Sequence, residues 1–319
     1  MAEAKKVASA PAKSSPRSSE LSISTFAAFR DRRFTLLWVS TFTFMLTQGI
    51  QRFAFVWLAI ELSESSGALG LVSFALGIPV LFVSMPAGML SDRIDRRLLL
   101  FDSQIFILAV STLSAILIWS GAISLPLVLV IALMVGLGAG FGMPVRQSIV
   151  PSLVPPERLM NAITLMSLGQ NTSMMVGPAI GGGAIAIWGI GGGFAVQAIL
   201  LGVGLIPLFF LRVPPPEGAT QHRAGEGREA LAGLSFVFRA PGVRALFLLL
   251  FVTALCIIGP FQAIIPKIAE ERLGSGALGA SLLYTSFGVG MIISSLFLAS
   301  VPNIPNAGGW FTGTVLFPV

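Results

Sequence analysis

The feature that most constrains this chain is a series of eight long apolar runs separated by short polar segments. A bilayer core about 30 Å thick needs roughly 20 apolar residues of helix to cross it. Of the 319 residues, 55% are apolar and 11% are charged, whereas about a quarter of an ordinary soluble domain is charged. We therefore expect an all-α polytopic membrane protein. The predicted spans are 34–60, 67–90, 98–120, 125–147, 159–188, 190–212, 244–268 and 276–300.

Lysine and arginine are distributed unevenly among the connecting segments. They are frequent before the first span and after the second, fourth and sixth, but absent from the connections after the first, third and fifth. Basic residues in short loops favour the cytoplasmic side. We therefore expect a multi-pass protein of the bacterial inner membrane with a cytoplasmic N-terminus. The net charge of +6 is then a topology signal, and we expect no nucleic-acid partner.

Composition divides the chain into four parts. A tail poor in large apolar residues is expected to be disordered, and a polar linker with a short amphipathic helix at about 228–239 follows the sixth span. A ninth apolar stretch begins at Gly308 and reaches Val319 before it is long enough to cross, so we expect this chain to be a C-terminally truncated form of a longer parent. The four parts are a tail (1–24), a six-helix bundle (25–212), a cytoplasmic linker (213–243) and an incomplete second bundle (244–319).

The loop after the second span carries a glycine, an aspartate four residues later and a basic cluster. These residues are Gly88, Asp92, Arg93, Arg96 and Arg97. The pattern resembles the signature loop of the major facilitator superfamily, although Asp95 stands where many members have glycine. The resemblance implies a conformational switch, in which Asp92 faces a helix end of the C-terminal half and stabilises the outward-open state. The basic residues would hold the loop at the anionic inner surface.

The junction between the fourth and fifth spans is more specific. It reads Met143-Pro-Val-Arg-Gln147, then Pro151, Val154-Pro-Pro-Glu-Arg-Leu159 and Asn161-Ala162. This resembles the enterobactin-exporter-like and macrolide-efflux-like branch of the superfamily. The resemblance implies a major-facilitator fold with a complete six-helix N-terminal half and about two and a half helices of the C-terminal half. It also implies a monomer.

The fifth span contains a cluster of small residues, Gly177, Pro178, Gly181 and Gly182. Small residues allow helices to approach closely, and a Gly-Pro pair allows a bend. The cluster is similar to the antiporter motif of exporting superfamily members, although two of that motif's glycines are Ser173 and Thr164 here. An ordinary packing seam is the alternative interpretation.

Polar residues inside the spans are candidates for function because they are costly there. Gln48 and Arg52 share one face of the first span. The family resemblance implies that the first and fourth helices line the cavity, so this face is expected to contact substrate. Asp102 in the third span and Arg146 in the fourth lie at similar depths and could pair, either as a structural ion pair or in a proton relay.

Met166, Gln170 and Met174 form a stripe along the fifth span at intervals of four residues. Such a stripe is typical of helix packing, and it would also suit a hydrophobic substrate pocket. We include these three residues among the expected substrate contacts.

The 319 residues contain no P-loop, HExxH motif, cysteine pair or Gly-x-Ser-x-Gly elbow. We therefore expect no enzyme, cofactor or metal site, and we expect coupling to an ion gradient in place of ATP. The resemblance implies export of a drug, macrolide or siderophore-like molecule by proton antiport with alternating access. The alternatives are a nutrient-uptake permease of the same fold and a membrane interaction protein, or inactive fragment, that transports nothing.

Overall fold

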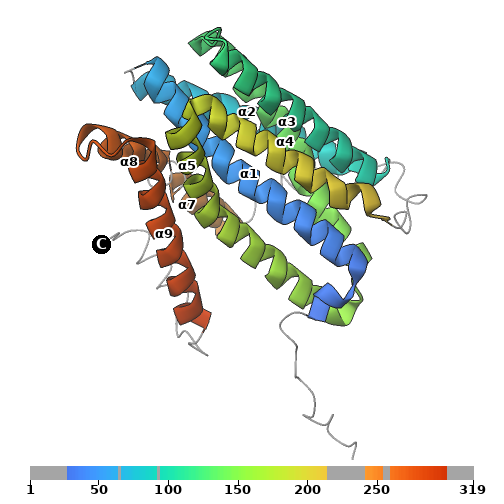
Figure 1. The fold of residues 1–319 in the computed structure, drawn as a ribbon. Coiled ribbons are helices and arrows are strands. Elements are labelled where there is room, and N and C mark those ends of the chain that lie inside the picture. Colours follow the sequence, from blue (N-terminus) through green and yellow to red (C-terminus); the bar gives the residue numbers. More distant parts are fainter. Residues whose placement is uncertain (1–26, 64–65, 92–93, 214–240, 254–258, 300–319) are drawn as a thin grey trace, which may run out of the picture.

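The computed structural model describes residues 27–63, 66–91, 94–213, 241–253 and 259–299, and their regular structure is helical throughout (Figure 1). Asp92, Arg93, the amphipathic helix expected at 228–239 and the final apolar stretch lie outside these residues. The helices are η1 (Ala27–Arg30), α1 (Arg32–Leu62), α2 (Ser66–Ser91), α3 (Arg96–Trp119), α4 (Leu125–Leu153), α5 (Pro156–Phe210), α7 (Pro241–Thr253), α8 (Gly259–Glu271) and α9 (Gly276–Ala299).

Helix α5 is two helices joined at Gly189. This glycine has φ 70° and ψ −177°, a left-handed conformation that side chains rarely adopt. The chain changes direction there, so α5 consists of a first arm (156–188) and a second arm (190–210), which are seen at different angles in Figure 1. The break coincides with the boundary predicted between the fifth and sixth spans.

Helix α1 packs mainly against α5 in the N-terminal bundle. It contacts both arms of α5: Gly49 meets Gly177 of the first arm, and Phe55 packs edge-on against Phe194 of the second. More than half of its residues are buried, including Ser40, Gln51 and three threonines. Four described helices, α2, α3, α4 and α5, are apolar and long enough to cross a membrane. Helix α1 is not among them, because its polar residues make it less apolar.

Two aspartates begin helices at the end of the bundle where α1 and α3 start. Asp31 is the N-cap of α1 and accepts a hydrogen bond from the Arg33 backbone N–H (2.9 Å). Asp95 is the N-cap of α3 and accepts one from the Arg97 backbone N–H (2.8 Å). An aspartate in the N-cap position satisfies one of the free N–H groups of the first turn. This gives Asp95, the departure from the signature loop, a structural role.

Helices α8 and α9 lie on one side of this bundle (Figure 1). The seventh predicted span corresponds to α7 and most of α8, with 254–258 outside the described residues. Helix α9 matches the eighth predicted span and packs against the first arm of α5. The Thr285 hydroxyl donates to the Met175 carbonyl oxygen (3.4 Å) in this contact, so the two parts of the chain meet along α5 and α9.

Candidate functional site

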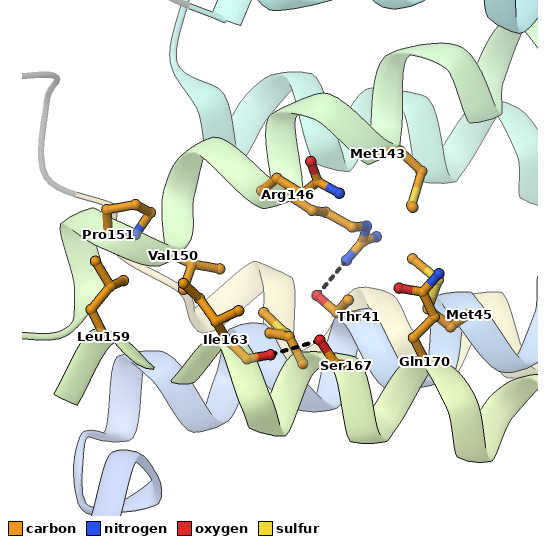
Figure 2. Close-up of a pocket in the computed structure, with 12 residues that line it drawn as sticks. Thr41, Met45, Met143, Arg146, Val150, Pro151, Leu159, Ile163, Ser167 and Gln170 are labelled. Atoms are coloured by element: carbon orange, nitrogen blue, oxygen red, sulfur yellow. Dashed lines mark hydrogen bonds between the residues drawn. The ribbon is translucent and has the colours of Figure 1, made fainter. Parts of the chain in front are cut away.

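A cavity of about 320 Å³ lies between α1, α4 and the first arm of α5 (Figure 2). Its walls are mostly apolar, with one or two polar residues contributed by each helix. A volume of roughly 300–1,000 Å³ with this composition is typical of small-molecule sites. The lining residues are Thr41 and Met45 of α1, Met143, Arg146, Gln147, Val150 and Pro151 of α4, and Leu159, Ile163, Met166, Ser167 and Gln170 of α5.

Arg146 is the one charged residue among the twelve that line the cavity, and it is 2% exposed. Its Nη1 donates to the hydroxyls of Ser40 (3.3 Å) and Thr41 (3.2 Å), and its Nη2 donates to Gln104 Oε1 (2.6 Å). The guanidinium also lies 4.4 Å from the centre of the Phe44 ring, a distance at which cation–π attraction is favourable. All these partners are neutral.

Gln104 connects the guanidinium to the rest of the bundle. It is fully buried in α3, and its Nε2 donates to the Leu201 carbonyl oxygen of the second arm (2.9 Å). The Arg146 side chain is therefore held by groups from α1 and α3, and through Gln104 it is linked to α5. Gln104, Ser40 and Thr41 were not predicted from the sequence to belong to a site. The signal available was a glutamine within an apolar span, which is costly unless it has a partner.

The structure does not pair Asp102 with Arg146, which corrects the pairing considered from the sequence. Asp102 is exposed, whereas Gln104 supplies the α3 contact to the guanidinium. Residues two apart on a helix lie on nearly opposite faces, so Asp102 and Gln104 cannot both point into the bundle.

Two of the five predicted substrate contacts, Met166 and Gln170, line the cavity. Met174 is exposed one turn further along the same stripe. The other two, Gln48 and Arg52, lie beyond the cavity on α1, where Arg52 is exposed and its Nε donates to the Gln48 carbonyl oxygen (3.3 Å). Spacing places them on the face of α1 that carries Thr41 and Met45, because 41, 45, 48 and 52 follow the helical repeat.

Part of the predicted switch loop holds helix ends together. Arg96 Nη1 donates to the Ser148 carbonyl oxygen near the end of α4 (3.0 Å). Arg97 donates through Nε to the Leu208 carbonyl oxygen (3.1 Å) and through Nη2 to that of Phe209, at the end of α5. Basic side chains are favourable at helix C-termini, where carbonyl groups lack partners. Gly88 is half-buried in α2, close to this loop.

The glycines of the antiporter-like cluster lie at two helix contacts. A Cβ on Gly177 would lie 2.9 Å from both the Gly49 Cα and the Leu46 carbonyl oxygen of α1, and one on Gly181 would lie 3.3 Å from the Ile50 Cα. A Cβ on Gly182 would meet Ser281 of α9 at 2.3 Å. Pro178 is buried beside them. The cluster thus allows α5 to approach α1 on one side and α9 on the other.

Another part of the branch-specific junction also has a structural role. Asn161 Oδ1 accepts a hydrogen bond from the Ala28 backbone N–H (3.0 Å), which ties η1 to the start of α5.

Among the described residues, no group of three or more His, Cys, Asp or Glu side chains is placed to hold a metal ion.

Comparisons with known proteins agree with this architecture. The profile of the transmembrane secretion effector family matches residues 23–307. Macrolide efflux protein A of Streptococcus pyogenes is 22% identical over 272 residues, which are 85% of this chain and 67% of that protein. The staphyloferrin A transporter of Staphylococcus aureus is 27% identical over 187 residues, 57% of this chain and 47% of that one.

A solved structure shares the fold. The bacterial homologue of the human lysosomal transporter Spinster, in an inward-facing and unoccupied conformation, superposes with a TM-score of 0.58 at 20% identity. The match covers 86% of this chain and 65% of that one, so the chain spans about two thirds of the length of that transporter.

The helices share the major-facilitator fold of that transporter. The chain belongs to the transmembrane secretion effector family of that superfamily. The superfamily and the all-α major-facilitator fold expected from the sequence are confirmed, whereas the expected C-terminal truncation stays a prediction.

Proposed function

We propose that this protein exports a small molecule across the bacterial inner membrane by alternating access, as a monomer whose N-terminus is cytoplasmic. The observation that carries this proposal is the cavity between α1, α4 and the first arm of α5, walled by apolar groups around one buried guanidinium. The names of the relatives support export over uptake, because the set includes a macrolide efflux protein.

The positions of the cavity and of the α5–α9 contact support this mechanism. The cavity reaches Pro151 and Leu159, next to the junction of α4 and α5, which is cytoplasmic in the proposed orientation. The contact of Gly182 with Ser281 lies near the other end of the first arm. A cavity near the cytoplasmic side with contact between the two parts of the chain near the outer side is the arrangement expected for loading from inside the cell.

Proton antiport is our proposed energy source, because the 319 residues lack a nucleotide-binding P-loop. The cavity-lining residues include no carboxylate or imidazole among those described. The proton would therefore bind at a group outside the cavity wall, for which exposed Asp102 is the candidate from the described spans.

Cellular accumulation of a panel of labelled drugs and siderophores, with the gene present or deleted, tests the proposed export. Export predicts lower accumulation of at least one compound when the gene is present, and loss of this difference when a protonophore collapses the gradient. Higher accumulation would instead identify an uptake permease. Equal accumulation of every compound would identify a membrane protein that interacts without transporting.

Arg52→Ala is expected to abolish export, because it removes the charge from the face of α1 that we expect to contact substrate. Membrane abundance should stay near normal. Arg52 is exposed and makes one long bond to a backbone carbonyl on its own helix, so its removal leaves no buried partner unsatisfied. Export and immunoblotted abundance measured in the same cells check this. A variant that loses abundance along with export would show that Arg52 supports the fold, and normal export would remove Arg52 from the substrate path.

A further inference from the structure

We infer that the cavity binds organic anions, with Arg146 receiving the carboxylate or equivalent acidic group of an otherwise apolar molecule. This inference rests on the proposed function only in that the molecule bound in the cavity is taken to be the transported one. The inference comes from the charge left unbalanced at the cavity wall.

Buried arginines are normally paired with a carboxylate, because an unpaired charge in a low-dielectric interior is costly. Arg146 is 2% exposed, yet its hydrogen-bond acceptors are two hydroxyls and one amide oxygen. Its Nε has no hydrogen-bond partner in the described part of the chain. The guanidinium is therefore positioned and partly solvated by neutral groups while its charge remains without a counter-ion in these residues.

The contacts on the cavity side are the ones that a ligand could replace. Thr41 lines the cavity with Arg146, and Figure 2 shows the guanidinium directed toward the Thr41 hydroxyl at the wall. The bonds from Nη1 to Ser40 and Thr41 are 3.3 and 3.2 Å long, whereas charge-assisted bonds to a carboxylate are typically about 2.7–2.9 Å and roughly twice as strong as neutral ones. A ligand carboxylate that displaces the Thr41 hydroxyl would exchange a weak contact for a strong one.

The remaining wall defines the rest of the ligand. Met45, Met143 and Met166 provide an adaptable apolar surface, and Gln170 offers an amide that can donate or accept. None of the lining residues is an acid, so a cationic molecule would meet Arg146 with no group to balance its own charge. The site thus favours an anion over its neutral counterpart, and both over a cation.

Gln104 provides a sharp test, because its Oε1 already lies 2.6 Å from Arg146 Nη2. In Gln104→Glu, the new carboxylate occupies the same position and supplies the missing counter-charge from within the protein. The carboxylate cannot donate to the Leu201 carbonyl oxygen as Gln104 Nε2 does, but it keeps the bond to Arg146, which then no longer needs a ligand anion. Gln104→Met is the matched control, because it removes the acceptor without adding a charge.

The experiment measures equilibrium binding of three probes with the same ring to the purified 319-residue protein in lipid nanodiscs. The probes are 1-naphthylacetate, its uncharged amide 1-naphthylacetamide, and 1-naphthylmethylammonium. We expect the acid to bind at least about tenfold more tightly than the amide, as a charge-assisted bond implies, and the cation to bind most weakly. Gln104→Glu should remove the preference for the acid, and Gln104→Met should keep it.

Equal affinity for acid and amide, absence of binding by all three probes, or an unchanged preference in Gln104→Glu would each overturn the inference. Melting temperatures of the variants show whether they fold, and the acid-to-amide ratio is a readout that a purely structural role of Arg146 would not change. The result is independent of transport direction. Anion binding without lower cellular accumulation would contradict the export proposal alone, and export without a charge preference would contradict this inference alone.

Discussion

Replacing Gly177 with alanine is expected to destabilise the protein by about 1–3 kcal/mol, the usual cost of overpacking a close contact. The new Cβ would lie 2.9 Å from the Gly49 Cα and 2.9 Å from the Leu46 carbonyl oxygen. Both are backbone atoms of α1 and cannot rotate away, so α1 and the first arm of α5 would have to separate. A lower melting temperature in detergent and less folded protein in the membrane are the measurable results.

Gly183→Ala is the control for this prediction. Gly183 lies in the same arm, but a Cβ there would have nothing within 4 Å, and alanine is favoured over glycine in a helix by about 1 kcal/mol. Gly183→Ala should therefore melt at or above the wild-type temperature. Equal melting temperatures for the Gly177 and Gly183 variants would mean that α1 and α5 are not in backbone contact at Gly177.

Valine in place of Gly182 is expected to reduce export about tenfold or more. The contact between α5 and α9 belongs to one conformation of the transport cycle, and valine would disfavour that conformation. The added Cβ would lie 2.3 Å from the Ser281 Cβ and 2.9 Å from the Ala277 carbonyl oxygen. A shift of about 1.4 kcal/mol in a conformational equilibrium changes its populations tenfold. Export rates from preloaded cells, corrected for membrane abundance, provide the measurement.

Two further variants separate the contact with α9 from other effects of valine. Gly183→Val places the same side chain one residue away, where a Cβ meets nothing within 4 Å, and should export normally. Ser281→Gly removes the Cβ that the valine would meet, so the double variant should recover part of the lost rate. Normal export by Gly182→Val alone would show that close approach of α5 and α9 is not required.

The spans could be predicted from the sequence because bilayer thickness sets the length of an apolar helix. The break at Gly189 could also be predicted, since a glycine-rich connection without charge separates two apolar runs.

The site was predicted less completely, because the sequence does not show how each helix is rotated about its own axis. Met166, Gln170 and Arg146 were identified by their spacing or charge, and all three line the cavity. Asp102 was identified and Gln104 was not, because charge is the stronger signal in a sequence, although only one of their opposite faces can point inward. That choice depends on the neighbouring helices, which also determine that Gly177 meets α1 and Gly182 meets α9.

The central claim is that the exported molecule binds in the cavity between α1, α4 and the first arm of α5. Its most direct test is labelling of Gln170→Cys by a membrane-impermeant maleimide, in a Cys256→Ser background that removes the one native cysteine. Glu157→Cys is the control, because Glu157 is exposed at the start of α5 and does not line the cavity.

We predict that Gln170→Cys is labelled in inside-out vesicles and that a compound identified by the accumulation assay slows this labelling, while Glu157→Cys is labelled at an unchanged rate. Labelling of Gln170→Cys at the same rate with and without a saturating concentration of an exported compound would contradict the account, because the molecule would then bind elsewhere.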